Sequence, residues 1–506
     1  AVEALDKALA LQPRLTEAFD YKVRALAAAG RLEEAFAACR PAVFGDSIPL
    51  ELRARESWLE SERGDVKAAI SKMRALVAEE PFYFWAWSRL CDWYQQTGDA
   101  DGYLESAQAL VKINPQYEVS MGYLGEARLI KGDRAGALEA YKRAFELAPR
   151  YEFAGLSLFD LQLEDGKLSE AATTLETLDK FVSGPLVDAR GAQLAAKQGD
   201  KKTTLHRLRS VCSKPFEIPW PVEAAVEAAD SAGWTSEAEE ALTLCLALPN
   251  PPAVVGRCWV KLGTRRGWQC EERLPELVEK GDIGLEATHA YLKAILEAGE
   301  KSRLRRFMET HRSMLEAHTF LWGSIGWVLT AFRDYHGAAN WMADWRKRDD
   351  AQPWMLVNTV EGFRNTSREA IAAECSRHAL TLKGNGRHLH HLWLAGDAAL
   401  EGDYKSAREH LEQSHAEPLD ADYEFLEVLT QSIVELGEVS SEVRKRIFPQ
   451  IRTRLDEAKA KYAAYALEPA RQRIYRKTLL ALAKLRGGPM TWIWYLIRWW
   501  NSFPAA

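Results

Sequence analysis

The sequence lacks several features that mark common protein classes. None of its seven cysteines forms a CxxC pair, and they are odd in number and scattered through 506 residues. In a long chain this pattern predicts reduced, mostly buried thiols in a cytoplasmic protein rather than a disulfide framework. No run approaches the roughly 18 apolar residues that a transmembrane helix needs, so we predict no membrane-spanning segment.

Charge of one sign is also not in excess. The formal net charge is -6, with 47% hydrophobic and 27% charged residues, which is ordinary for a soluble, well-packed protein. Such a balance gives no overall attraction to nucleic acid or to an anionic membrane. The one unusual count is 18 tryptophans, most of which follow residue 200 or so.

Catalytic and phosphate-binding motifs are missing as well. The sequence has no GxSxG, and no cysteine lies in a recognisable catalytic context with a paired histidine. Gly384-Asn385-Gly386 has no preceding strand and no following Lys-Ser/Thr, so it predicts a turn between helices rather than a phosphate loop. We therefore expect neither catalysis nor a cofactor in this chain.

One histidine cluster remains as a candidate metal site. His388 and His391 have the i, i+3 spacing of ligands on a helix, and His390 lies between them. No HExxH motif or second cluster accompanies them. The pattern therefore favours a solvated or interface-lining helix face, and we predict no metal.

What the sequence does contain is an internal repeat. Pro81, Pro115 and Pro149 are evenly spaced, and each follows an amphipathic pattern. Glycines recur at the same interval, each followed by Asp, with Ala or Tyr five residues on. These glycines are Gly64, Gly98 and Gly132, with Ala69, Tyr103 and Ala137. The phase continues through Gly166, Gly199, Gly233, Gly299, Arg333, Ser367 and Gly402, and the stretch from Gly233 to Gly299 fits about two units.

This pattern, with its period of about 34 residues, resembles the tetratricopeptide repeat family over roughly residues 1–415, most strongly up to about 180. The copy that carries the resemblance best has Trp87, Leu90, Tyr94 and Gly98, and the next has Leu124, Gly125, Gly132, Ala137, Tyr141, Ala144 and Pro149. The resemblance implies an all-α protein, a right-handed α-solenoid of antiparallel helix pairs with a helical C-terminal cap. Each glycine would close a helix in the left-handed conformation.

The repeat also suggests an organisation in four parts. We expect an N-terminal array over 1–250, a degenerate array over 251–415, capping helices over 416–487 and a Trp-rich tail over 488–506. The opening AVEALDKALALQP matches only the second helix of a unit. Because a solenoid that starts in mid-hairpin exposes an apolar face, we expect residues upstream, either a helix or a domain.

The resemblance implies that the first helix of each unit lines a groove in which a partner protein or peptide lies. At these positions the candidates are Trp85, Arg89, Asp92, Tyr123 and Glu126. Asp20 and Arg24 stand where the carboxylate clamp of chaperone-binding members needs Lys and Asn, so a chaperone tail is a poor guess. The predicted function is a protein-protein interaction scaffold. The alternative is the regulatory or substrate-recruiting part of an enzyme whose catalytic domain or subunit is separate.

A middle region interleaves aromatic and basic residues, which can indicate nucleic acid. The set comprises Arg303, Arg305, Arg306, Phe307, Trp322, Trp327, Trp341, Trp345, Arg346, Lys347 and Arg348. Trp341 and Trp345 are four residues apart and share a helix face. This spacing favours packing between helices over nucleic-acid binding.

The tail concentrates tryptophan in a segment too short to span a bilayer. Trp492, Trp494, Trp499 and Trp500 are its docking candidates. Upstream lies a basic helix with Arg471, Arg473, Arg476, Lys477, Lys484 and Arg486. Three interpretations stay open: packing on the protein's own body, partner docking or oligomerisation, and an interfacial membrane anchor that would make the protein peripheral to a membrane.

Overall fold

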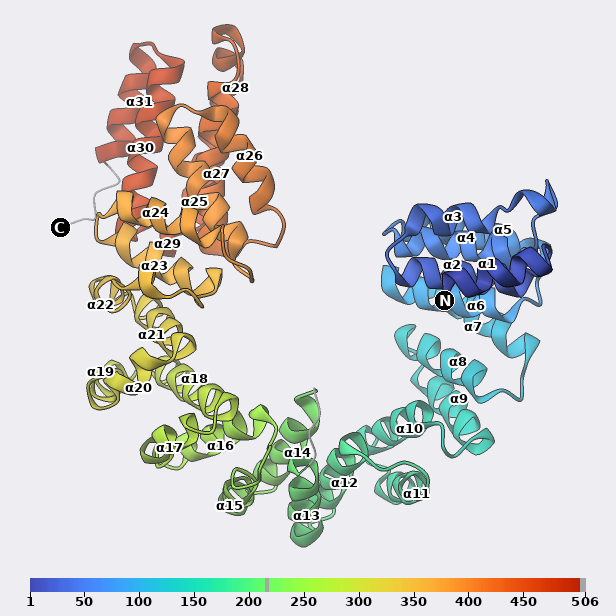
Figure 1. The fold of residues 1–506 in the computed structure, drawn as a ribbon. Helices are drawn as coiled ribbons and strands as arrows, with labels where there is room; N and C mark the ends of the chain where they lie inside the picture. The colour runs from blue at the N-terminus through green and yellow to red at the C-terminus, as the bar shows by residue number, and fades with distance from the viewer. Residues whose placement is uncertain (214–217, 501–506) are drawn as a thin grey trace. The chain divides into compact units, whose positions relative to one another are not determined.

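The computed structural model describes residues 1–213 and 218–500, and every regular element in these ranges is a helix (Figure 1). The chain divides into two compact units, Ala1–Ala241 and Leu242–Ala506. The sequence placed its first boundary at residue 250; the other two boundaries, after residues 415 and 487, stay predictions. The fold is the all-α solenoid that the repeat predicts.

The helices of the first unit follow one another in antiparallel pairs. They are α1 (Val2–Leu11), α2 (Thr16–Ala28), α3 (Leu32–Cys39), α4 (Leu50–Glu62), α5 (Val66–Glu79), α6 (Phe84–Thr97), α7 (Ala100–Ile113), α8 (Glu118–Ile130), α9 (Arg134–Leu147), α10 (Glu152–Glu164), α11 (Leu168–Asp179), α12 (Pro185–Lys197), α13 (Lys201–Cys212) and α14 (Trp220–Ser231). A short 3-10 helix, Ala42–Phe44, precedes α4. Helix α15 (Thr235–Cys245) crosses the boundary between the units.

The second unit begins with less regular pairs and ends in longer helices. They are α16 (Ala253–Arg265), α17 (Leu274–Val278), α18 (Asp282–Glu297), α19 (Lys301–Thr310), α20 (Arg312–Ala317), α21 (Thr319–Ala331), α22 (Tyr335–Trp341), α23 (Pro353–Asn365), α24 (Glu369–Ala379), α25 (Arg387–Glu401), α26 (Tyr404–Ser414), α27 (Ala421–Gly437), α28 (Ser441–Lys461), α29 (Ala463–Ala466), α30 (Pro469–Arg486) and α31 (Pro489–Trp500). Two 3-10 helices, Glu271–Arg273 and Trp345–Lys347, lie among them.

The period of the helices equals the period of the sequence. The first helices of five consecutive pairs begin at Thr16, Leu50, Phe84, Glu118 and Glu152, and the interval from each start to the next is the same. Equivalent residues of neighbouring pairs therefore occupy the same position on successive helices. This regularity places the candidate groove residues in rows.

Several turns within a pair combine a glycine with an aspartate that caps the following helix. Gly98 ends α6 in the left-handed conformation, with φ 73°, and the Asp99 carboxylate accepts a hydrogen bond from the backbone N–H of Gly102 at 2.9 Å. Such a cap satisfies one of the N–H groups that a helix start leaves unpaired. The same cap forms at Asp65, Asp133, Asp200, Asp334 and Asp403.

The weak copies of the repeat keep the backbone conformation of the strong ones. Arg333 and Ser367, which stand in place of the turn glycine, adopt φ 59° and 64°. Gly267, in the stretch that fits two units, adopts φ 85°. The register that the sequence predicts is therefore confirmed where the glycine itself has been replaced.

The predicted burial of the thiols is confirmed, since all seven cysteines are buried. Burial raises the pKa of the Cys39 thiol to about 12 and also raises the pKa values of Cys91 and Cys375. These thiols are protonated at neutral pH, so they behave as small apolar side chains.

The C-terminal helices are joined to the solenoid by a buried charge. The Arg471 side chain on α30 is 1% exposed and donates hydrogen bonds at 2.9 and 3.0 Å to both oxygens of Glu361 on α23. It also donates to Glu468 at 2.8 Å and to Asp422 at 3.3 Å. Burial raises the pKa of Asp422 to about 6, although Arg471 opposes this shift. Helix α30 thus connects to helices that precede it by up to 110 residues.

We expect Ser367→Gly to stabilise the second unit by about 1 kcal/mol, because glycine adopts positive φ without the steric cost that serine pays. The measurement is the free energy of unfolding from urea denaturation. Ser302→Gly makes the same chemical change at an exposed position within α19 and should give no gain. Equal effects of the two changes would argue against strain at Ser367.

We expect Arg471→Met to destabilise the second unit by about 3–5 kcal/mol, because it leaves the Glu361 carboxylate buried without its cation. Hydrogen exchange should show lost protection in α23, α27 and α30, with the first unit unchanged. The control is Arg346→Met, which breaks an exposed pair with Glu374 and should cost less than about 1 kcal/mol. Similar losses from both changes would contradict a central role for Arg471.

Candidate functional site

Two rows of side chains cross the first helices of the N-terminal pairs. One row, which recurs at the interval of the repeat, consists of Tyr21, Arg55, Arg89 and Tyr123 on α2, α4, α6 and α8. The second row lies three residues further along each helix and consists of Arg24, Trp58, Asp92 and Glu126. Because residues three apart are neighbours on a helix surface, the two rows form one continuous strip.

The N-terminal end of this strip is hollowed. We call the space the N-terminal hollow; it has a volume of about 770 Å³. Its lining comes from α1, α2, α4 and α6 and consists of Ala1, Leu5, Tyr21, Arg24, Ala25, Ala27, Ala28, Arg55, Trp58, Glu62, Trp85 and Arg89. Alanines and aromatic rings line the hollow together with the three guanidinium groups of Arg24, Arg55 and Arg89.

Each arginine of the hollow lies over an aromatic ring. The Arg55 guanidinium carbon is 4.3 Å from the centroid of the Trp85 ring and 5.6 Å from that of Trp58. Arg24 lies 5.4 Å from the Tyr21 ring and Arg89 lies 6.0 Å from the Trp85 ring. Stacking on aromatic faces restrains the long side chains while their N–H groups stay available for an anion.

Two of the arginines are already paired, and one is not. Arg55 donates to Asp20, and Arg89 forms an ion pair with Asp92 at 2.8 Å. Within residues 1–213 and 218–500, Arg24 forms no ion pair, and the buried Nε of Arg89 has no hydrogen-bond acceptor. The hollow therefore contains one N–H donor without an acceptor, on Arg89, beside the exposed Arg24 cation.

The remaining candidates from the sequence form two separate sets of hydrogen bonds beyond the lining of the hollow. Tyr123 donates its hydroxyl to Asp92 at 2.9 Å, and Tyr103 donates to Glu126 at 2.7 Å. Gln95 donates to the other Glu126 oxygen at 2.6 Å. Burial raises the pKa values of both tyrosines, and the carboxylates raise them further. These contacts join α6, α7 and α8 and hold the strip in place.

The sequence interpretation missed most of the residues that line the hollow. Trp85 and Arg89 line it as candidates, whereas Asp92, Tyr123 and Glu126 lie beyond its lining. Tyr21, Arg55 and Trp58 were not singled out, and Arg24 was considered only as a mismatch to the carboxylate clamp. All four occupy the positions equivalent to Arg89 and Asp92 in the two preceding repeats, so the period itself was a signal that could have found them.

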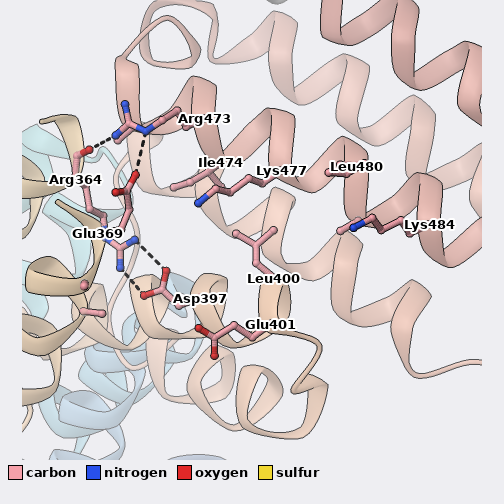
Figure 2. Close-up of a pocket in the computed structure, with 14 residues that line it drawn as sticks. Arg364, Glu369, Asp397, Leu400, Glu401, Arg473, Ile474, Lys477, Leu480 and Lys484 are labelled. Carbon is pink, nitrogen blue, oxygen red and sulfur yellow. Dashed lines mark hydrogen bonds and ion pairs between the residues drawn. The ribbon is translucent and has the colours of Figure 1, made fainter. Parts of the chain in front are cut away.

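A second hollow of about 550 Å³ lies within the C-terminal unit, where α30 passes α24 and α25 (Figure 2). Arg364 pairs with Asp397 at 2.6 Å, and Arg473 pairs with Glu369 at 3.1 Å (Figure 2). The two arginines of this hollow are thus each paired with a carboxylate. The basic helix upstream of the tail therefore turns part of its charge toward the protein, with Arg471 fully buried.

His388 and His390 are buried and His391 is partly buried, whereas the sequence predicted a solvated or interface-lining helix face. His390 is fully buried, and its Nε2 lies 2.9 Å from the carbonyl oxygen of Pro353. His391 instead contacts His410, with 2.8 Å between their Nδ1 atoms. No group of three or more metal-ligating side chains converges in the described part of the chain. Gly384 and Gly386 form a turn between α24 and α25, as predicted.

Three aromatic residues of the middle region are buried between helices. Trp322, Trp345 and Phe307 are at most 2% exposed. Arg348 lies 5.1 Å from the Trp322 ring and pairs with Asp344 at 2.8 Å, and Arg346 pairs with Glu374. This arrangement agrees with helix packing, the interpretation that the sequence favoured.

The tail candidates separate onto two sides of α31. Trp494 is buried and meets Phe448 of α28 edge to face, with ring centroids 5.2 Å apart. Trp492 and Trp500 are exposed, and Trp499 is intermediate. Residues 501–506 of the predicted tail lie outside the described residues.

No family model and no curated protein matches the chain. Among solved structures, it is similar to PilF of Pseudomonas aeruginosa, with 15% identity, 38% of this chain and 89% of that chain covered, and a TM-score of 0.34. A tetratricopeptide repeat protein from Parabacteroides merdae has 15% identity, covers 45% and 91%, and has a TM-score of 0.33. A structure of Naa15/Naa10 bound to HypK-THB has 16% identity, covers 99% and 80%, and has a TM-score of 0.38. These likenesses concern the fold alone; the resemblance to tetratricopeptide repeats rests on the helix pairs of this chain and their period.

Proposed function

We propose that this chain is a protein-interaction scaffold that binds an extended, acidic segment of a partner protein in the N-terminal hollow. The observation that carries the proposal is the set of three guanidinium groups, Arg24, Arg55 and Arg89, each backed by an aromatic ring. A solenoid offers such a strip for an elongated ligand, because equivalent side chains repeat along it.

The charges of the hollow favour an acidic ligand. Its lining holds three arginines and a single carboxylate, Glu62. Arg24 is exposed, and a planar guanidinium matches the two oxygens of a carboxylate. The neighbouring alanines and rings offer apolar surface for the side chains between the acidic residues. A segment that alternates acidic and apolar or aromatic residues therefore fits this site.

The chemistry of the hollow supports binding rather than catalysis. A guanidinium group carries five N–H donors and no acceptor, so it holds an anion firmly but is unsuited to act as a general base. An alternative role, the regulatory or substrate-recruiting part of an enzyme with a separate catalytic domain or subunit, uses the same hollow. Affinity purification from the native organism separates the two roles, because capture of a catalytic subunit favours recruitment.

We expect Arg24→Glu to weaken binding of an acidic peptide about tenfold, because it replaces one attractive charge contact with a repulsive one. The probe is a fluorescein-labelled peptide that alternates Asp or Glu with Phe or Leu, and the measurement is fluorescence polarisation. Binding of the wild-type protein should also weaken as salt concentration rises.

Arg150→Glu is the matched control, since it reverses an exposed charge outside the hollow. It should leave the affinity near that of the wild type. A peptide in which Lys replaces every acidic residue should bind at least about tenfold more weakly than the acidic peptide. Equal affinity for the acidic and basic peptides, or equal effects of the two variants, would refute the proposed ligand class.

A further inference from the structure

The final described helix, α31, has two opposite faces. On one face, Thr491 and Trp494 are buried, and Arg498 pairs with Asp456 of α28. The Trp494 ring packs against Phe448 of the same helix. These contacts fix the orientation of α31 on the C-terminal cap, so the direction of its other face is also fixed.

The opposite face of α31 is apolar and exposed. We call it the α31 apolar face; it consists of Trp492, Ile493, Leu496, Ile497 and Trp500. The exposed fractions of Ile493, Leu496 and Ile497 are 49%, 57% and 53%. A soluble helix ordinarily presents polar residues on this side. With Met490, this one helix supplies six of the 19 exposed large apolar side chains in the part of the chain that the structure describes.

The segment around this face is strongly basic. Residues 441–500 contain 14 Lys and Arg but only four Asp and Glu, a net charge of +10 in a chain whose total is -6. The apolar face therefore lies within a concentration of positive charge that the overall composition conceals. Several of these cations pair with carboxylates outside the segment, as Arg454 does with Glu435 and Arg473 with Glu369. The exposed cations that remain are the ones that can attract a partner of negative charge.

Part of this charge lies beside α31. Lys445, Arg452 and Lys459 follow one stripe of α28 at intervals of seven residues. Phe448 and Asp456, which contact α31, lie on the same stripe. Lys445 and Arg452 are exposed. The contacts of Phe448 and Asp456 therefore place these cations on the side of α28 that faces α31.

The titration of Lys459 agrees with this placement. Burial lowers the pKa of the Lys459 ammonium, Asp456 opposes the shift, and Arg498 and Arg476 add to it. Positive groups from α28, α30 and α31 therefore lie close enough to interact.

The length of α31 limits how the helix can bind a bilayer. Twelve residues at about 1.5 Å each make a helix of about 18 Å, whereas the hydrocarbon core is about 30 Å thick. Within the described ranges, no helix is both long and apolar enough to cross a membrane. An apolar stripe with tryptophan near both ends and cations at its side instead suits a position in the plane of the interface.

We propose that the α31 apolar face docks on an anionic membrane surface. Ile493, Leu496 and Ile497 enter the boundary between headgroups and acyl chains, and Trp492 lies at the level of the headgroups. Lys445 and Arg452 contact the lipid phosphates and carboxylates. This surface belongs to the C-terminal unit and acts independently of the N-terminal hollow, so each proposal can fail without the other.

The test is co-sedimentation of the full chain with vesicles of phosphatidylcholine that contain about 30% phosphatidylserine. The wild-type protein should sediment with these vesicles and at least about tenfold less with phosphatidylcholine alone. The triple variant Ile493→Ser/Leu496→Ser/Ile497→Ser should lose at least about tenfold in partitioning. Because these side chains are exposed, circular dichroism should show an unchanged fold.

Two further variants separate apolar insertion from charge. Lys445→Glu/Arg452→Glu should weaken sedimentation with anionic vesicles about tenfold, and rising salt should weaken the wild type in the same way. Phe82→Ser/Phe181→Ser removes exposed apolar side chains from the N-terminal unit and should leave partitioning unchanged. An equal loss in this control would overturn the assignment to α31.

The alternative to a membrane is that a second copy of the chain covers the α31 apolar face. If the wild type forms a concentration-dependent dimer by sedimentation equilibrium, the triple variant abolishes it, and neither protein binds vesicles, the proposal is overturned. Equal vesicle binding by the wild type and the triple variant, or no binding by the wild type, also overturns it.

Discussion

The close approach of the two helices in each pair is the constraint on which the fold depends. A Cβ added to Gly125 of α8 would lie 2.7 Å from the ring of Tyr141 on α9, and one added to Gly102 of α7 would lie 2.6 Å from Tyr94 on α6. Small residues therefore admit large rings at the crossing points, and the rings fill the space that the glycines leave. This packing fixes each pair as a unit of constant geometry.

Because the pairs share one geometry, residues that repeat in the sequence form a continuous surface. Because the pairs repeat at one interval, the row of Tyr21, Arg55, Arg89 and Tyr123 runs across successive helices. The rings beneath the arginines restrain them, and Asp20 and Asp92 set their directions. The candidate site is thus a consequence of stacking, since no single pair holds more than part of it.

The C-terminal cap of the solenoid depends on one buried ion pair. At the C-terminal end, longer helices cover the last pair, and Arg471 joins α30 to α23 through a doubly hydrogen-bonded contact with Glu361. Such a buried pair is costly to break from one side, which makes it a specific anchor. Beyond this anchor, Ile493, Leu496 and Ile497 of α31 are exposed.

The sequence by itself determined the helix pairs, their period, the turn positions and the burial of the thiols. These features are local or repeated, so they follow from residues within one unit; even Arg333 and Ser367 keep the turn conformation. Only the tertiary structure decided that His390 is internal, that Arg24, Arg55 and Arg89 share one hollow, and that Arg471 is buried. Each of these depends on contacts between helices distant in sequence, as between Glu361 and Arg471, and side-chain chemistry along one helix does not reveal which neighbour lies opposite.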